Sequence, residues 1–406
     1  MPVAPLRNAI SLLAFGIAAG CTVTPPSDNI EPVAEGGAYQ AQYRMFEARE
    51  ASPVLRSETM NRSRCRPPIG GDGRGAGKYS HAPSALTGEV LTRGDLVSLR
   101  LPDDEDFTAQ YVISRDGTLK LPYLSPIKAQ GRTPQAVARD VERALVAGGY
   151  YDETPDVSVL VMDFAPARVA VSGAVFEPHA VDIGGVPGDQ VDSLRQSALG
   201  ASSEGRNLSV ALRGAGGVRP DADLSAVKLT RGGTTYTLDM RGILYGYDAP
   251  DVVLIAGDEI NVPSRMCFQD DLMQPSPISP PGISLFLSNL TQPANNNAAS
   301  AIGETVRQVP YGARFMQAVV DNNCVGGARA SSASRSAALF SRNPMTKVST
   351  VIERPIEVMR ARADRDDYDP FLLPGDAIAC YDSSVTNLAE IGRVVTVVGA
   401  AALVVP

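Results

Sequence analysis

The sequence predicts an α+β protein in which strands outnumber helices. The 406 residues include 37 Gly and 31 Pro but no Trp, a composition that favours turn-rich β structure joined by extended linkers. The pattern L-x-x-G-D-x-[VI]-x-apolar also occurs three times, at 91–99, 254–262 and 372–380. Such a repeat predicts a turn feeding a strand, with Gly adopting the turn conformation and Asp bonding the neighbouring backbone. The length allows roughly two to four domains.

The N-terminal residues 1–20 predict a secretory signal. Arg7 precedes the run "ISLLAFGIAAG", which is apolar but too short to span a bilayer as a mature helix. The run meets Cys21 after two small residues, as in bacterial lipoprotein signals that are cut before a lipidated cysteine. Thr22 and not Asp follows Cys21, which resembles lipoproteins that are sorted to the outer membrane. We therefore expect lipidation of Cys21 and a mature chain that is anchored to the bacterial outer membrane and lies mostly in the periplasm. Ordinary cleavage nearby, with a free Cys21, is the alternative.

The remaining composition restricts the chemistry. Four further cysteines, at 65, 267, 324 and 380, allow three disulfide pairings, and the sequence does not choose among them. None forms a C-x-x-C pair and only His81 and His179 could assist, so we expect no metal site and no cofactor. The formal net charge of −8, without a Lys/Arg cluster, predicts that the protein does not bind nucleic acid.

The next elements follow a Pro- and Gly-rich arm at 21–84. The glycine-rich run in this arm departs from the phosphate-loop pattern, so we interpret it as linker. Strands are expected at 89–102, at 107–124 as a pair around the turn Asp116-Gly117, and at 155–164. Between them "TPQAVARDVERALVAGG" predicts a helix with Thr133 as N-cap, Pro134 at its first position and Gly148-Gly149 as its end.

Three stretches carry a resemblance to a known family. Gly94-Asp95, "ISRDGTLKLPYLSPIKAQGRTPQAVARDVERAL" and "YYDETPDVSVLV" resemble the outer-membrane polysaccharide export lipoproteins, which form the exit channel for capsules and exopolysaccharides. "VAVSGAVFEPHAVDI" through "LIAGDEINVP" resembles a soluble-ligand-binding β-grasp domain, and a more divergent copy runs from "VRQVPYGARFMQAVVDNN" to "LLPGDAIACY". The resemblance covers most of residues 85–382.

This resemblance implies a domain order. After the signal peptide (1–20) and the lipid-anchored arm (21–84) we expect an export domain and two β-grasp domains that are separated by a linker. A C-terminal transmembrane helix ends the chain. The expected ranges are 85–167 for the export domain, 168–264 for the first β-grasp domain, 265–303 for the Pro/Asn/Ser-rich linker, 304–382 for the divergent β-grasp domain and 383–406 for the membrane helix.

The resemblance also implies a function. Members form rings, commonly octamers, so we expect a homo-octamer or similar ring that conducts capsular or extracellular polysaccharide passively to the cell surface. Its partners would be the polymer, the outer membrane and an inner-membrane polysaccharide co-polymerase. The runner-up is a periplasmic lipoprotein that binds glycan or cell wall without forming a pore.

The uncharged tail "VVTVVGAAALVVP" after Arg393 fits the membrane helix. Residues 387–405 as a helix would span about 28 Å, close to the hydrocarbon thickness of roughly 27–30 Å. Small residues gather on one side of this helix and bulky residues on the other. A buried strand is the alternative, because β-branched residues favour strands. The bulky residues expected to form part of the membrane helix are Ile391, Val394, Val395, Val397, Val398 and Leu403.

Catalysis finds no support in the sequence, so we expect no catalytic residue and a protein that is not an enzyme. No nucleophile motif occurs, and the acidic stretches "LPDDEDF" and "RADRDDYDP" read as solvated loops. The residues expected to line the passage or touch the polymer are Arg115, Asp116, Lys120 and Tyr123. The alternative is that they form only a turn and a strand end.

Overall fold

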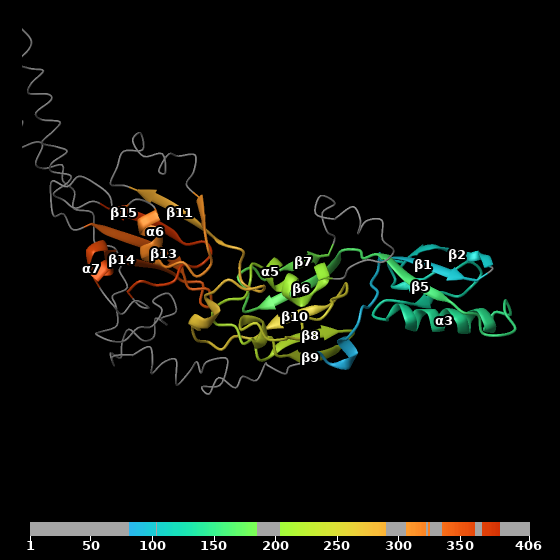
Figure 1. Ribbon diagram of the computed structural model, residues 1–406. Coiled ribbons are helices and arrows are strands. Elements are labelled where there is room, and N and C mark those ends of the chain that lie inside the picture. The colour runs from blue at the N-terminus through green and yellow to red at the C-terminus, as the bar shows by residue number, and fades with distance from the viewer. Residues whose placement is uncertain are drawn as a thin grey trace, which may run out of the picture.

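The computed structural model describes residues 81–102, 104–184, 204–289, 306–321, 324, 335–361 and 368–381. Within these ranges strands predominate and helices are few, which confirms the predicted α+β class at that level. Three hydrophobic cores follow one another along the molecule (Figure 1), and we call the parts around them the first, second and third units. The expected signal peptide, nearly all of the expected arm and the expected membrane helix lie outside the described residues.

The first unit is a three-stranded antiparallel sheet covered by one helix. The strand order is β2 (Asp104–Val112), β1 (Leu96–Leu101), β5 (Ser158–Asp163), and a two-stranded ribbon pairs β3 (Thr118–Leu119) with β4 (Ile127–Lys128). Helix α3 (Pro134–Ala147) begins as expected, because the Thr133 hydroxyl accepts a hydrogen bond from the Ala136 N–H at 3.3 Å. Its apolar stripe, Val137, Val141 and Leu145, is fully buried in the core.

The second unit is a five-stranded mixed sheet with one helix. Its order is β7 (Ala180–Ile183), β6 (Ala167–Gly173), β10 (Glu259–Val262), β8 (Val227–Arg231), β9 (Thr234–Leu238). The central pair, β6 and β10, is parallel and the other pairs are antiparallel. Helix α5 (Leu208–Gly214) packs against β6 and β7. We expected the first unit to begin at residue 85, but Leu86 lies in the core of the second unit and not in the core of the first.

The third unit repeats this topology. Its order is β12 (Val306–Val309), β11 (Ile283–Asn289), β15 (Ala377–Tyr381), β13 (Ser336–Arg342), β14 (Ser349–Pro355), again with a parallel central pair, β11 and β15. Helices α6 (Phe315–Asp321) and α7 (Ile356–Ala361) contribute buried residues to its core.

The expected linker 265–303 was wrong in its first half. Strand β11 lies inside that range, with Ile283 and Leu285 fully buried. Upstream of it, Phe268 packs in the core of the third unit, whereas Ile278 packs in the core of the second. The strand was not predicted because the alternation of apolar residues in "ISLFL" is short and follows a Pro-rich run.

The three copies of the repeated turn have the same local geometry. Gly94, Gly257 and Gly375 have φ values of 91°, 94° and 88°, a region that favours glycine. In each copy the following Asp accepts a hydrogen bond from the backbone N–H three residues earlier, at 2.8, 2.9 and 2.9 Å. Strands β1, β10 and β15 begin directly after these turns, so the predicted turn that feeds a strand is used three times.

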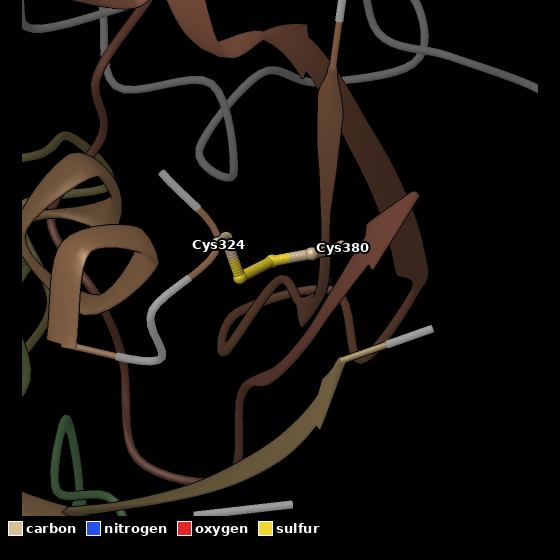
Figure 2. Close-up of a disulfide and its surroundings, with 2 residues drawn as sticks. All are labelled: Cys324 and Cys380. Atoms are coloured by element: carbon tan, nitrogen blue, oxygen red, sulfur yellow. A yellow bond between two sulfur atoms is a disulfide. The ribbon is translucent and has the colours of Figure 1, made fainter. Parts of the chain in front are cut away.

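One of the disulfides left open by the sequence is resolved in the third unit. Cys324, after α6, is bonded to Cys380 in β15 with a Cα–Cα distance of 5.9 Å (Figure 2). Cys267 is disulfide-bonded as well. The bond at Cys324 fixes the end of the α6 segment to the central strand of the sheet.

Candidate functional site

The predicted contact residues surround a turn at the start of the β3–β4 ribbon. Gly117 has φ of 78°, and its N–H donates to the Ser114 carbonyl at 2.8 Å. The Gly117 carbonyl in turn accepts hydrogen bonds from the N–H groups of Ala129 and Gln130, both at 2.9 Å. A Cβ atom at this position would lie 2.9 Å from the Gln130 side chain. The turn is therefore pinned to the far end of the ribbon and needs glycine.

The expected strand pair around this turn was wrong. Ser114 and Thr118 are joined by one backbone bond of 2.9 Å, but β2 pairs with β1, and β3 pairs with β4. The two strands that flank the turn do not pair with each other, because β2 forms its backbone hydrogen bonds with β1 and β3 forms its own with β4. Alternation along the sequence shows that a stretch is extended but does not name its partner.

Asp116 and Lys120 are brought together at the solvent-exposed edge of the turn. The Asp116 carboxylate accepts from the Thr118 hydroxyl at 2.7 Å and lies 3.0 Å from Lys120 Nζ. The Thr118 hydroxyl, followed by Lys120, lowers the pKa of Asp116 to about 2, so this carboxylate is charged at any physiological pH. Arg115 is exposed beside the pair. The turn thus presents two positive side chains and one negative side chain to solvent.

Tyr123 is presented in an unusual backbone conformation. Leu121 and Leu124 close a turn through a backbone bond of 3.4 Å, with Pro122 and Tyr123 at its corner. Tyr123 has φ of 60° and is 83% exposed, while Leu121 is buried. A bulky side chain in this left-handed region is rare and strained. The structure therefore holds an aromatic ring out in solvent at some energetic cost.

A buried ion pair that the sequence did not reveal lies between the first and second units. Arg206 Nη1 donates to the Asp95 carboxylate at 3.0 Å, and both side chains are at most 1% exposed. Asp95 belongs to the first repeated turn, but Arg206 stands alone between polar residues in "SSEGRNLS". No periodicity or motif marks such an arginine, so only the folded structure reveals it.

The rest of the predicted site falls elsewhere. Within the described ranges, no three His, Cys, Asp or Glu side chains gather in a way that could hold a metal ion. The described segments also contain no helix with the length and apolar character that a membrane crossing requires. The expected lipidation site and the expected membrane residues lie outside the described residues: Cys21, Ile391, Val394, Val395, Val397, Val398 and Leu403.

Comparison with known proteins gives three matches to proteins of one kind. The family model described as polysaccharide biosynthesis/export protein matches residues 84–162, which is nearly the whole first unit. An EPS I polysaccharide export outer membrane protein, EpsA of Ralstonia nicotianae, is 26% identical over 310 residues, covering 70% of this chain and 74% of the relative. The EpsA protein of Ralstonia solanacearum is 29% identical over 183 residues, covering 44% and 43%.

These matches agree with the residues that carried the resemblance. The family model spans the first repeated turn, the Asp116 turn, the Tyr123 turn and α3. The longer match extends the relationship over most of the chain. Residues 84–162 thus match the polysaccharide biosynthesis/export family, and most of the chain is similar to an outer-membrane polysaccharide export protein.

Proposed function

We propose that this protein is the subunit of a ring-shaped outer-membrane channel that exports capsular or extracellular polysaccharide from the periplasm to the cell surface. The observation that carries the proposal is the export-family match over the first unit, extended by a relative that is named as a polysaccharide export outer membrane protein. The polymer would pass by conduction through a polar lumen without any bond being made or broken. The protein would therefore not act as an enzyme.

The three units supply the periplasmic part of this channel. We assign the first unit to the export domain and the two five-stranded units to β-grasp domains, because both sheets have the same strand order and a parallel central pair. Each unit has its own hydrophobic core. Folded units of this kind are better suited to form the wall of a channel than to serve as a flexible linker.

The two ends of the chain supply the membrane attachment. Cys21 would carry lipid, and residues 387–405 would cross the outer membrane as a helix in each of about eight subunits. Rings of this kind follow from heterologous contacts between identical copies whose rotation closes. An inner-membrane co-polymerase would supply the polymer from the other side of the periplasm.

The exposed edge of the first unit is the proposed polymer contact. Arg115, Lys120 and Asp116 offer charged hydrogen-bond groups, and the Tyr123 ring offers a flat apolar surface with a polar tip. These groups are all solvent-exposed. They leave a hydrated polymer free to slide, since none encloses it.

The experiment that tests the function is complementation of a strain lacking this gene. The full chain is expected to restore polysaccharide at the cell surface, and a chain without residues 384–406 is expected to leave the polymer in the periplasm. The control is the amount of protein recovered in the membrane fraction for both chains. Undiminished export by the shortened chain would contradict the channel and favour a periplasmic glycan-binding lipoprotein.

A further inference from the structure

The chain crosses between the first and second units twice. Leu86 packs in the core of the second unit, and the chain then enters the first unit at Leu91, which packs in the core there. It returns from Phe164 in the first core to Ala167 at the start of β6. In Figure 1 the blue segment runs along the second unit before it joins the cyan sheet. Two covalent crossings restrict the relative motion of the two units more than a single linker would.

Two copies of the repeated turn meet at this joint. The Ala256 N–H of the second turn donates to the Thr92 hydroxyl of the first turn at 2.9 Å. The Ala256 carbonyl accepts from Gln130 Nε2, also at 2.9 Å. Both backbone polar groups of Ala256 are therefore bound by side chains of the first unit. Because Thr92 and Ala256 are buried, a rotation that broke these bonds without admitting water would leave these groups unsatisfied.

Arg206 adds the most restrictive contact. Its guanidinium contacts both oxygens of Asp95 at 3.0 and 3.2 Å and donates to the Val90 carbonyl of the first crossing at 3.0 Å. It also donates to the Leu254 carbonyl at 3.2 Å and lies 4.8 Å from the centre of the Phe164 ring. A planar guanidinium with partners on several sides fits one arrangement only. Separating the two members of a buried ion pair leaves an uncompensated buried charge, so departures from this arrangement are costly.

We infer that the first and second units form one rigid body, locked in a single orientation by Arg206, and that the joint does not bend while the protein works. The inference rests on the contacts alone and stands whether or not the protein forms a channel. The device is specific to this joint. In the third repeated turn Pro374 stands where Ala256 stands in the second, so that position has no N–H to donate.

A distance measurement tests the inference. Spin labels are placed on two exposed positions through Gln135→Cys on α3 and Lys228→Cys on β8 of the full-length protein. The labelled chain is co-assembled with an excess of the chain without these cysteines, so that only distances within one subunit are measured, and the unaltered chain alone measures the background. Electron spin resonance should give one narrow distance, unchanged between detergent and outer-membrane vesicles. A broad or two-peaked distribution, or a shift between the two environments, would overturn the rigid joint.

The role of Arg206 is tested with a matched control. Arg231 forms the equivalent pair with Asp258 at 2.6 Å, but wholly within the second unit. Arg206→Met should lose the single narrow distance, whereas Arg231→Met should keep it. If Arg206→Met does not fold, Arg206→Lys, which keeps the charge but not the planar fork, should still broaden the distribution. A narrow distance in a folded Arg206 variant would overturn the assignment of the lock to this residue.

Discussion

The Asp of the repeated turn makes the same backbone contact three times but has different charge partners. Asp95 and Asp258 are paired with Arg206 and Arg231. Asp376 instead accepts from the Ser341 hydroxyl at 2.6 Å and the Leu373 N–H at 2.9 Å. Burial raises the pKa of Asp376 to about 7. The carboxyl group of the third turn therefore titrates near neutral pH.

Stability of the third unit should fall as this group loses its proton. The unfolded chain releases the proton near pH 3.8 and the folded protein near pH 7. The stabilisation is thus complete below the lower value and is lost as the pH rises through the upper one. Asp376→Asn should remove this dependence and raise stability at pH 8 by on the order of 2 kcal/mol, measured by denaturant unfolding between pH 4 and pH 8.

Asp258→Asn is the control for this prediction. It removes the charge partner of Arg231 and should lower stability at pH 8, because a largely buried arginine is left without its carboxylate. If the Asp376→Asn protein followed the same stability curve against pH as the wild type, the assignment of the titration to Asp376 would be wrong.

Tyr123 combines a strained backbone with an exposed ring, which suggests selection for contact and not for stability. Tyr123→Gly should relieve the left-handed strain and stabilise the protein by up to about 1 kcal/mol, as measured by thermal unfolding. The same change should reduce polysaccharide export by complemented cells. Tyr123→Phe keeps the ring and should export normally. Normal export by Tyr123→Gly would exclude the ring from the polymer path.

Local signals in the sequence predicted individual residues well where the chemistry is local. Thr133 caps α3 as expected, and the repeated glycines take the positive φ that a turn requires. Arg206 could not be predicted, because its partners Asp95, Val90 and Leu254 are distant in sequence. Contacts between units depend on how whole sheets pack against one another. The sequence around a single arginine therefore does not predict its partners in another unit.

At the scale of the elements, the central parallel pair of the second unit depends on one glycine. Gly173 ends β6 with φ of 89°, and a Cβ atom there would lie 2.1 Å from the Val262 carbonyl oxygen of β10. Gly173→Ala should therefore separate the end of the two strands and cost at least about 3 kcal/mol of unfolding free energy.

Gly233→Ala is the matched control for that change. Gly233 has φ of 83° but no atom within 4 Å of its Cβ position, so it should cost only the backbone strain, about 1 kcal/mol. Comparing the thermal unfolding of the two variants separates the cost of the steric contact with Val262 from the cost of the positive φ. Equal losses would show that the contact with Val262 does not restrict β6.

The disulfide of the third unit closes a long loop. Cys324 and Cys380 are 56 residues apart, and loop-closure entropy over that separation corresponds to about 4 kcal/mol. Replacing both cysteines with serine should lower the free energy of unfolding by roughly that amount, as measured by denaturant unfolding without reductant. Equal unfolding midpoints with and without the bond would contradict this account of the third unit.

Elements were predicted where their pattern is long and bounded. Helix α3 and strands β1 and β5 lie where alternation and caps placed them. Strand β11 was missed because its pattern is five residues long beside a Pro-rich stretch, and the partners of β2 and β3 were wrong because pairing is a long-range choice. The sequence therefore predicts which residues form extended strands better than it predicts which strands pair with each other.

At the scale of the whole molecule, repeated units are joined by specific contacts. The second joint also has a defined contact, since Arg219 of the second unit donates to the Pro344 carbonyl of the third at 3.1 Å. Phe176 and Tyr311 meet edge to face across the same joint with ring centres 6.4 Å apart. These two contacts fix how the second and third units lie against each other.

The channel requires that the C-terminus crosses the outer membrane. The direct measurement is thiol labelling of intact cells that carry Pro406→Cys, with a membrane-impermeant reagent and the unaltered chain as background. Gln135→Cys on α3 serves as the periplasmic control and should react only after permeabilisation. The account predicts that Cys at position 406 reacts on intact cells. Labelling at 406 only after permeabilisation would keep the tail in the periplasm and contradict the proposed channel.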